Sequence, residues 1–241
     1  MSEKKPIDLQ DPHEIRAMFD AIAPKYDFLN RLLSFGLHRG WRRRAVSFLA
    51  EKRGGLMLDI AAGSGDVSLE LLSLEPSRVV ATDFAPAMLE VLKRKLNGHA
   101  GQGRIEVVIC DALHLPFQDR LFDGAIVAFG IRNFADRDAA LREMFRVLAP
   151  GGISVVLEFS RPDRFIVRVV NDLYMNLGVP LLGGIISGHR AAYRYLPRSI
   201  GAFPERVEFV SSMKAAGFAA VEAHSLTMGV ATVYVGTREK E

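Results

Sequence analysis

A glycine-containing loop, set between a short apolar run and a helical pattern, is the first feature of this sequence that could do chemistry. The segment reads Leu58-Asp59-Ile60-Ala61-Ala62-Gly63-Ser64-Gly65-Asp66. Two glycines one residue apart let the backbone turn sharply and approach a ligand without an intervening Cβ. In open α/β sheets, ligands bind beyond the carboxyl ends of the strands. The candidate cofactor-binding residues of this loop are Asp59, Ala61, Gly63, Ser64 and Gly65.

The charges around the loop discriminate between cofactors. A dinucleotide-binding loop carries a third glycine three residues further on, whereas Gly65 is followed by Asp66, Val67 and Ser68. Carboxylates at Asp59 and Asp66 repel a pyrophosphate but suit a cation, such as the ammonium and sulfonium groups of S-adenosyl-L-methionine. The pattern therefore favours S-adenosyl-L-methionine, and a nicotinamide-dependent oxidoreductase is the weaker alternative.

Two more carboxylates follow the next predicted strands. Asp83 lies about 20 residues beyond Gly63 and precedes Phe84, and a carboxylate there can accept hydrogen bonds from ribose hydroxyls. Asp111-Ala112 follows the third strand and is a candidate contact for the adenine edge. Both aspartates could instead cap a following helix, so their types alone leave this open.

The elements that must position these residues alternate between strands and helices from residue 56 onward. Strands are predicted at 56–60, 78–82, 105–109, 122–129, 153–158, 219–225 and 230–236, and helices at 66–74, 86–96, 136–148 and 204–216. The first five strands are apolar on both faces, which is typical of a parallel sheet. The last two are separated by only a few residues, too few for a helical crossover, and should pair antiparallel. The fold class is α/β: a Rossmann-like, seven-stranded, mostly parallel sheet with helices on both faces.

The regions before and within this pattern predict additions to one domain. Residues 1–53, helical from about residue 11, are predicted to form an N-terminal helical cap on the domain of residues 54–241. Residues 161–203 form an unusually long connection, which predicts a substrate lid. Within it, the glycine-broken apolar run 177–186 predicts an adaptable flap over an apolar substrate tail.

Composition excludes several classes of protein. The 241 residues are 49% hydrophobic and 24% charged, which excludes disorder and low complexity. The single cysteine, Cys110, excludes a disulfide framework and a cysteine-rich zinc site; it is expected to be a small core side chain, and no metal site is predicted. Residues 1–10 lack a secretory signal, and no segment is apolar enough to span a membrane. A cytoplasmic protein is predicted.

Net charge is only +3, yet basic residues gather in one short segment of the cap. They are Arg39, Arg42, Arg43, Arg44, Lys52 and Arg53. A solvated helix face is one interpretation, and contact with anionic lipid at the inner face of the membrane, or with a phosphate-bearing partner, is the other. The sequence leaves a homo-oligomeric state open.

The loop, Asp83, Asp111-Ala112 and Leu115-Pro116-Phe117 together resemble class I S-adenosylmethionine-dependent methyltransferases. Two longer segments narrow the resemblance to the ubiquinone/menaquinone biosynthesis C-methyltransferases. The first runs from Tyr26-Asp27-Phe28-Leu29-Asn30 through Leu33-Ser34 to His38 and Trp41, and the second runs from Arg146 to Ser160. Phe129-Gly130-Ile131-Arg132-Asn133 and Tyr193-Arg194-Tyr195-Leu196 match as well. The chain departs from the family pattern at Leu29, Ser64, Ala128 and Ala149; Ala128 replaces a serine that contacts the cofactor in some relatives.

The resemblance implies methyl transfer from S-adenosyl-L-methionine, leaving S-adenosyl-L-homocysteine, to a ring carbon of a polyprenylated quinol. Demethylmenaquinol is the first substrate implied, and the equivalent benzoquinol of ubiquinone biosynthesis is the alternative. A ring carbon becomes nucleophilic when a hydroxyl ionises, so the site must stabilise a phenolate. Arg132, Asn133, Tyr26 and His38 are the candidate catalytic residues, with Arg132 in an electrostatic role because guanidinium stays protonated. Ala128 completes the candidate cofactor contacts.

Two other classes of function remain as alternatives. The basic segment of the cap is compatible with an RNA-directed methyltransferase, although the sequence lacks an aromatic-interleaved basic strand and no nucleic acid is expected. A non-catalytic scaffold in a quinone-synthesis assembly would retain the fold and lose cofactor binding.

Overall fold

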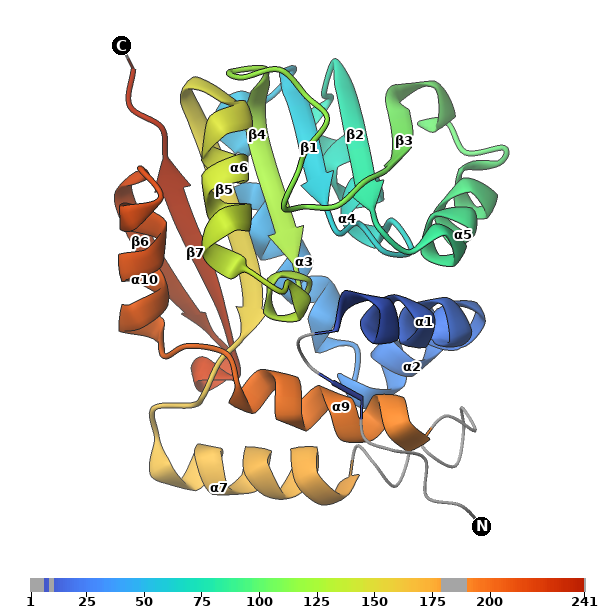
Figure 1. Ribbon diagram of the computed structural model, residues 1–241, viewed down its shortest axis with the longest axis vertical. Helices are drawn as coiled ribbons and strands as arrows, with labels where there is room; N and C mark the ends of the chain where they lie inside the picture. The colour runs from blue at the N-terminus through green and yellow to red at the C-terminus, as the bar shows by residue number, and fades with distance from the viewer. Residues whose placement is uncertain (1–6, 9–10, 179–189, 241) are drawn as a thin grey trace.

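A seven-stranded sheet forms the centre of the protein in a computed structural model that describes residues 7–8, 11–178 and 190–240 (Figure 1). The strands are β1 (Leu56–Ile60), β2 (Arg78–Asp83), β3 (Ile105–Ile109), β4 (Phe122–Ala128), β5 (Leu148–Phe159), β6 (Ala219–Leu226) and β7 (Ala231–Thr237). Their order is β3-β2-β1-β4-β5-β7-β6. β7 pairs antiparallel with β5 and with β6, and the other pairs are parallel. The predicted fold class is confirmed.

Helices cover both faces because successive strand residues face opposite sides of the sheet. Met57 and Leu58 of β1 are both fully buried, yet they belong to two different hydrophobic clusters. α3 (Leu37–Ser47), α4 (Asp66–Leu71) and α5 (Pro86–Leu96) pack on the first face, and α6 (Arg137–Val147) and α10 (Arg206–Ala215) pack on the second. β1 lies between β2 and β4, so the chain reverses its direction of travel across the sheet beside the glycine loop.

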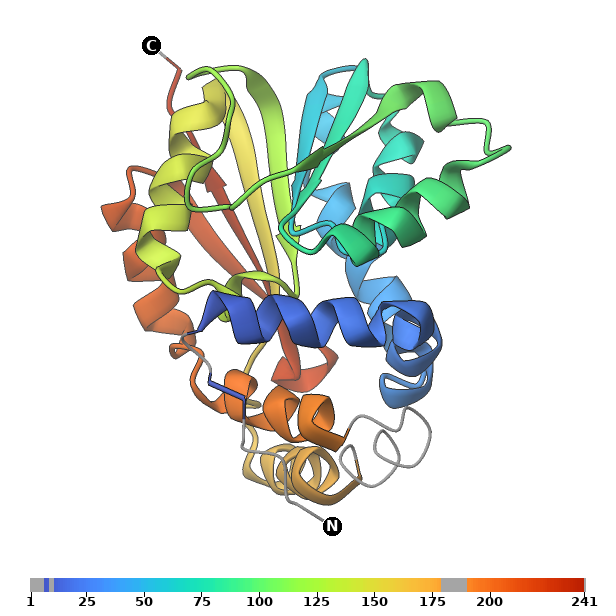
Figure 2. The same cartoon turned by 45° about the vertical axis from the view of Figure 1, so that its right-hand side comes forward.

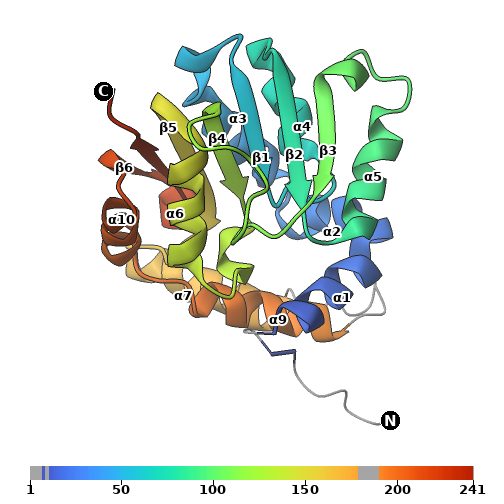
Figure 3. The same ribbon diagram turned by 45° about the horizontal axis from the view of Figure 1, so that its top comes forward.

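The helices that were predicted as cap and lid lie at the carboxyl ends of the parallel strands (Figures 1, 2 and 3). They are α1 (Pro12–Ile22), α2 (Tyr26–Leu33), α7 (Phe165–Leu173) and α9 (Arg190–Gly201). Asp11 starts α1 by accepting hydrogen bonds from the backbone amides of His13 and Glu14, with proline in the first turn. α7 continues through a π-helical turn, η6 (Tyr174–Gly178). Residues 179–186 of the predicted flap lie outside the described residues.

Several element boundaries differ from the sequence predictions for local reasons. β5 begins at Leu148 rather than 153, because the chain pairs with β4 on both sides of a register shift at Phe122 and Gly124. The helix predicted over 66–74 is α-helical only to Leu71 and closes with a 3-10 turn at Leu72–Leu74. The last helix begins at Arg206, where Glu205 and Glu208 form a capping box. Within the described residues, no helix is both long and apolar enough to cross a membrane.

Candidate functional site

Two adjoining cavities lie where the carboxyl ends of the parallel strands meet the α1, α2, α7 and α9 helices. The larger has a volume of about 580 Å³ and the smaller about 100 Å³. Both are lined by Phe19, Tyr26, Ala61, Gly63, Ala128 and Phe129. A group bound in one cavity therefore faces a group bound in the other across this shared wall.

Asp83, at the end of β2, organises the smaller cavity. Its Oδ2 accepts a hydrogen bond from the Gly63 amide at 2.8 Å, and its Oδ1 accepts one from the Ala85 amide at 2.8 Å. The carboxyl thus ties the glycine loop to the start of α5, so part of the capping role open in the sequence is real. Burial raises the pKa of Asp83 to about 6. Each oxygen retains lone-pair capacity for a further donor in the cavity.

The two glycines of the loop have different roles. Gly63, at φ +56°, lines both cavities. Gly65, at φ +81°, lines neither: a Cβ there would lie 2.1 Å from Cδ1 of buried Leu92, so its glycine lets α4 approach α5. Asp59 also lines neither cavity. Its carboxylate accepts a 2.5 Å hydrogen bond from Ser68, and burial raises its pKa to about 7.

The acidic charge around the loop is compensated by cations of the cap and of α5. Asp66 pairs with Arg42 at 2.9 Å and with Lys95 at 2.6 Å, and Lys95 also pairs with Asp27 at 2.6 Å. Ser64 donates a 2.5 Å hydrogen bond to Asp27. Asp66 therefore does not present a free negative charge to a cationic cofactor. Its carboxylate fastens the cap to the loop instead, a role that depends on partners distant in sequence.

The far end of the smaller cavity combines one exposed carboxylate with apolar walls. Asp111 accepts a hydrogen bond from the Leu113 amide at 3.0 Å, and Phe84 and Ala112 line the same space. Cys110 lines it too and is half-buried, which corrects the expectation of a core side chain: β3 ends at Ile109, and the next residue faces the cavity. Burial raises the pKa of the Cys110 thiol to about 11, so the thiol stays protonated at neutral pH.

Backbone strain concentrates where the cavities meet. Ala61 and Phe129, after β1 and β4, both have positive φ values, +52° and +57°. Such conformations in residues other than glycine cluster at functional sites, where the surrounding structure fixes them. The Gly130 backbone allows the close approach, because a Cβ there would lie 2.7 Å from the Ala61 Cβ. Ala128, one residue before Phe129, lines both cavities.

Arg132 places a buried guanidinium at the larger cavity. One amino nitrogen donates to Glu158 Oε1 at 2.9 Å and also to the Phe129 carbonyl, while the buried Nε has no hydrogen-bond partner among the described residues. Burial raises the pKa of the fully buried Glu158, and the Arg132 charge opposes that shift. Arg132 therefore forms a buried salt bridge with Glu158 and also lines the larger cavity.

Asn133 does not join Arg132. It lines only the smaller cavity, and its side-chain oxygen accepts a 2.8 Å hydrogen bond from the buried Tyr195 hydroxyl of α9. Arg132 and Asn133 are consecutive residues of the short 3-10 turn Ile131–Asn133, yet Arg132 lines the larger cavity and Asn133 the smaller one. Tyr195 was found through the motif on α9, and its contact with Asn133 had no local sequence signal.

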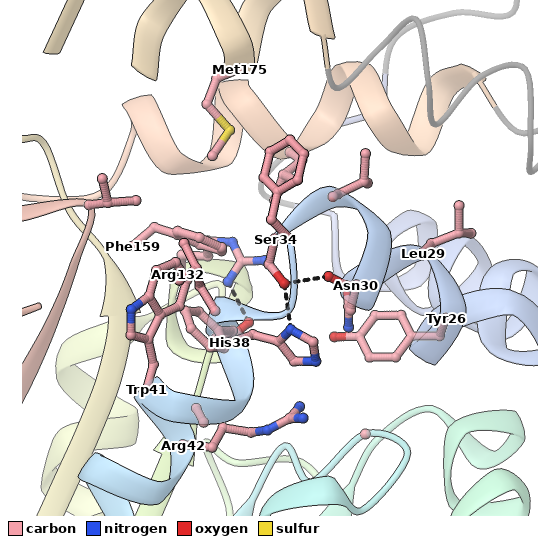
Figure 4. A pocket seen from close by; sticks show the side chains of 18 of the residues that line it. Tyr26, Leu29, Asn30, Ser34, His38, Trp41, Arg42, Arg132, Phe159 and Met175 are labelled. Atoms are coloured by element: carbon pink, nitrogen blue, oxygen red, sulfur yellow. Dashed lines mark hydrogen bonds between the residues drawn. The ribbon is translucent and has the colours of Figure 1, made fainter. Parts of the chain in front are cut away.

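Polar residues of α2, of α3 and of the turn between them line the larger cavity (Figure 4): Tyr26, Asn30, Ser34, His38 and Arg42. Ser34 Oγ donates a 2.6 Å hydrogen bond to the Asn30 carbonyl and is also hydrogen-bonded to His38 Nδ1. Burial, followed by the charge of Arg42, lowers the pKa of His38 to about 4, so its ring is neutral at pH 7. Tyr26 lies beside Asn30, and burial raises the pKa of its hydroxyl above 10. The sequence identified Tyr26 and His38 as candidate catalytic residues, whereas the hydrogen bonds of Ser34 to Asn30 and His38 are seen only in the structure.

The rest of the larger cavity is apolar. Leu29, Leu33, Tyr174 and Met175 contribute side chains from opposite walls, and most of the remaining residues around it are aliphatic or aromatic. Trp41 is buried, packs against Phe129 and Phe159, and donates a 2.8 Å hydrogen bond to Thr227, as expected of a packing residue. An apolar space with few polar groups at one end suits a ligand with a polar head and a hydrocarbon tail.

The basic segment of the cap is largely compensated on its own surface. Arg42 pairs with Asp66, Arg43 with Glu70 at 3.5 Å and Arg53 with Glu75 at 2.8 Å. Arg44 stacks over Phe48. These contacts favour the interpretation of this segment as a solvated helix face.

The family model and the curated relatives that match this chain all describe methyltransferases. The model of the ubiE/COQ5 methyltransferase family matches residues 7–238. A demethylmenaquinone methyltransferase of Thermus thermophilus is 49% identical over 222 residues, covering 92% of this chain and all of that protein. A ubiquinone/menaquinone biosynthesis C-methyltransferase UbiE of Geotalea daltonii is 44% identical over 227 residues, covering 93% of this chain and 96% of that protein.

Solved structures show the same fold at low sequence identity. The [4+2]-cyclase SpnF superposes with a TM-score of 0.70 at 16% identity, covering 98% of this chain and all of that one. A S-adenosylmethionine-dependent methyltransferase of Thermotoga maritima, described as a possible histamine N-methyltransferase, gives a TM-score of 0.64 at 19% identity, with 92% and 99% coverage. A cyclase and a methyltransferase share this architecture, so the fold alone does not define the reaction.

Proposed function

Because the chain belongs to the ubiE/COQ5 methyltransferase family, we propose that it methylates a ring carbon of a polyprenylated quinol with S-adenosyl-L-methionine as methyl donor. Conversion of demethylmenaquinol to menaquinol is the proposed reaction, since the Thermus thermophilus relative carries that name. The equivalent benzoquinol methylation is the second candidate, favoured by relatives named for both pathways. The observation that carries the proposal is the buried guanidinium of Arg132, held by Glu158, in the lining of an apolar cavity that shares a wall with the strand-end cavity.

The residues of the smaller cavity fit S-adenosyl-L-methionine. Asp83 would accept hydrogen bonds from the ribose hydroxyls with the lone pairs left by its backbone contacts, and Asp111 and Ala112 would meet the adenine beside Phe84. The backbone of Ala61, Gly63 and Ala128 borders both cavities and would lie beside the donor end of the cofactor. Asp59, Ser64 and Gly65 would act by shaping and fastening the loop. When bound, the cofactor supplies an electrophilic methyl group on a positively charged sulfur.

Arg132 is proposed to lower the pKa of the quinol hydroxyl. A phenol has a pKa near 10, so its ionisation at pH 7 costs about 4 kcal/mol. A buried, preorganised guanidinium donor directed at the oxygen stabilises the charge that develops there. Glu158 holds the guanidinium in place and, through a 3.4 Å contact with the Arg132 amide, also holds the turn that presents it. Arg132 therefore stabilises a phenolate rather than removing a proton.

His38 is proposed to accept the hydroxyl proton, because its hydrogen bonds fix its tautomer. Ser34 has one hydroxyl proton and donates it to the Asn30 carbonyl, so its contact with His38 requires Nδ1–H to be the donor. In a neutral ring, Nε2 then carries a free lone pair. Because the pKa of His38 is about 4, Nε2 can accept a hydrogen bond and carry the proton transiently, but the ring does not stay protonated at neutral pH.

The remaining candidate residues are proposed to position these groups. Tyr26, whose raised pKa keeps it protonated, is a donor at the wall shared by the two cavities. Asn133 is proposed to act through Tyr195, anchoring α9 against the turn that carries Arg132. Residues 1–53 as a cap and the described part of 161–203 as a lid would exclude water from the reaction. Contact with a membrane surface is proposed because the tail of the substrate is insoluble in water.

Methyl transfer with a panel of quinols tests this proposal. Radiolabelled S-adenosyl-L-methionine is incubated with demethylated naphthoquinols and benzoquinols, each in its reduced and its oxidised form. We expect label only in the reduced compounds, because ionisation of a hydroxyl must activate the ring, and faster transfer to the naphthoquinol. Equal labelling of reduced and oxidised forms would contradict the mechanism, and binding of the cofactor without transfer to any quinol would favour the scaffold alternative.

A further inference from the structure

α7 lies at the surface of the protein (Figures 1 and 3), and its outer face is nevertheless apolar and exposed. Six of the thirteen exposed large hydrophobic side chains of the described chain lie on α7 and η6: Phe165, Ile166, Val169, Val170, Leu173 and Leu177. At 100° per residue they fall within an arc of about 140°. Phe165 and Ile166 are 70% and 76% exposed. The opposite side of the same helix, with Val167, Asn171 and Tyr174, lines the larger cavity.

This face continues into the rim of the cavity. The exposed residues that also line the larger cavity come from three places: Ile166 and Val170 of α7, Phe35 before α3 with Leu37 at its first position, and Met228 after β6. Phe35 contacts the ring of Tyr174, with 5.5 Å between centroids, so the two sides of the rim touch. The cavity is therefore open beside an apolar surface rather than a polar one.

Cationic side chains lie close in sequence to these rim residues. Arg161 and Arg164 precede α7 and are exposed, Arg168 lies beside Phe165, and Arg31 and Arg39 flank the Phe35 turn. Of the two acidic residues near α7, Asp163 is paired with Arg206 at 3.1 Å, and Asp172 is exposed. A helix with one wide apolar face and arginines beside it is typical of segments that lie in the interface of an anionic bilayer. Arg42, Arg43 and Arg53 of the basic segment, in contrast, are compensated by ion pairs on the protein.

We propose that the outer face of α7 and the Phe35 turn dock on an anionic lipid bilayer, so that the larger cavity opens directly into the membrane interface. Only the benefit of docking rests on the proposed function: the polyprenyl chain of the substrate could then pass from the lipid into the cavity without crossing water. The docking itself is independent of catalysis, because Phe165, Val169, Leu173 and Leu177 do not line the cavity.

Vesicle co-sedimentation of the full chain tests the docking without any substrate. The probes are vesicles of phosphatidylcholine mixed with phosphatidylglycerol, and vesicles of phosphatidylcholine alone. Phe165→Ser/Val169→Ser/Leu173→Ser is expected to lower binding to anionic vesicles at least about tenfold, since each large side chain contributes on this scale when buried in lipid. Val207→Ser is the matched control, because Val207 is 77% exposed on α10, away from the rim, and should bind like the wild type. Weaker binding to neutral vesicles is expected of every form.

Several outcomes would overturn the proposal. They are absence of wild-type binding to anionic vesicles, an undiminished affinity in the triple variant, or loss of binding in Arg43→Gln/Arg53→Gln but not in the α7 variant. Dimerisation of the wild type that the triple substitution abolishes, with no vesicle binding, would assign the face to a second copy. A lower melting temperature with unchanged vesicle binding would assign it to packing within the chain.

Activity measurements separate this proposal from the proposed function. The triple variant should methylate a short-tailed, water-dispersed quinol at the wild-type rate and lose at least about tenfold on a long-tailed quinol embedded in vesicles. Equal activity on both presentations would overturn the docking role while leaving methyl transfer intact. Vesicle binding by a protein that methylates no quinol would do the reverse.

Discussion

The two cavities are built from different parts of the chain and by different forces. The smaller is formed by strand ends, where backbone amides and carboxylates are fixed by the sheet: Asp83 is bonded to Gly63 and Ala85. The larger is formed mostly by helices of the cap and the 161–203 connection, and its walls are apolar side chains with Arg132 and His38 at one end. One cavity is specified by directional hydrogen bonds, and the other by shape and burial.

The contrast predicts that polar substitutions in the larger cavity affect turnover and those at the strand ends affect cofactor affinity. Both effects should be separable in one assay set, because Arg132 and His38 line only the larger cavity, whereas Asp83 and Asp111 line only the smaller one. The predictions below test that separation, beginning with the largest expected effect.

Arg132→Lys should lower kcat about 10²–10³-fold, because a lysine cannot keep the Glu158 contact and also direct a second donor at the quinol oxygen. The affinity for S-adenosyl-L-homocysteine, measured by isothermal titration, should not change. Arg142→Lys, at an exposed arginine of α6, is the matched control. An unchanged kcat would remove Arg132 from the mechanism, and a large loss of cofactor affinity would break the separation of the two cavities.

Gly65→Ala should destabilise the fold by about 2–5 kcal/mol, the sum of left-handed strain and collision with Leu92. Gly98→Ala is the matched control: its φ is +75°, but no atom lies within 4 Å of the added Cβ, so only about 1–2 kcal/mol of strain is expected. Urea denaturation measures both. Equal losses in the two variants would mean that the α4–α5 approach does not constrain the loop.

Protonation of Asp83 should weaken cofactor binding in acid. Its folded pKa of about 6 lies above the ordinary value of 3.8, so ionisation of this carboxyl disfavours the fold above about pH 6, and that penalty is relieved as the pH falls toward 4. Affinity for S-adenosyl-L-homocysteine should move oppositely: constant above about pH 7 and falling up to about tenfold per unit below pH 6, because a protonated carboxyl loses acceptor capacity. Asp83→Asn should bind weakly with a flatter pH profile, and an unaltered profile would assign the titration to another group.

The contrast between the strand-end cavity and the helix-lined cavity also explains how much of the site could be predicted from the sequence. The strand ends repeat a local pattern, an apolar run followed by a carboxylate, so Asp83 and Asp111 were predicted as site residues, and both line the smaller cavity. The pairing of Asp66 with Arg42 and Lys95 was not, because those partners come from α3 and α5. The contact of Asn133 with Tyr195 could not be predicted for a similar reason, because Tyr195 comes from α9.

Ser34→Ala should have the smallest effect and the most specific signature. Loss of the Ser34 hydroxyl removes the acceptor that holds the proton on Nδ1 of His38, so ¹⁵N chemical shifts of the ring should move toward the Nε2–H tautomer. One lost hydrogen bond of about 1 kcal/mol predicts a decrease in kcat of about fivefold with little change in KM. Ser34→Thr keeps the hydroxyl and should restore both the tautomer and the rate. A lowered kcat without a change of tautomer would show that Ser34 supports packing alone; a changed tautomer without a lower kcat would exclude His38 as the proton acceptor.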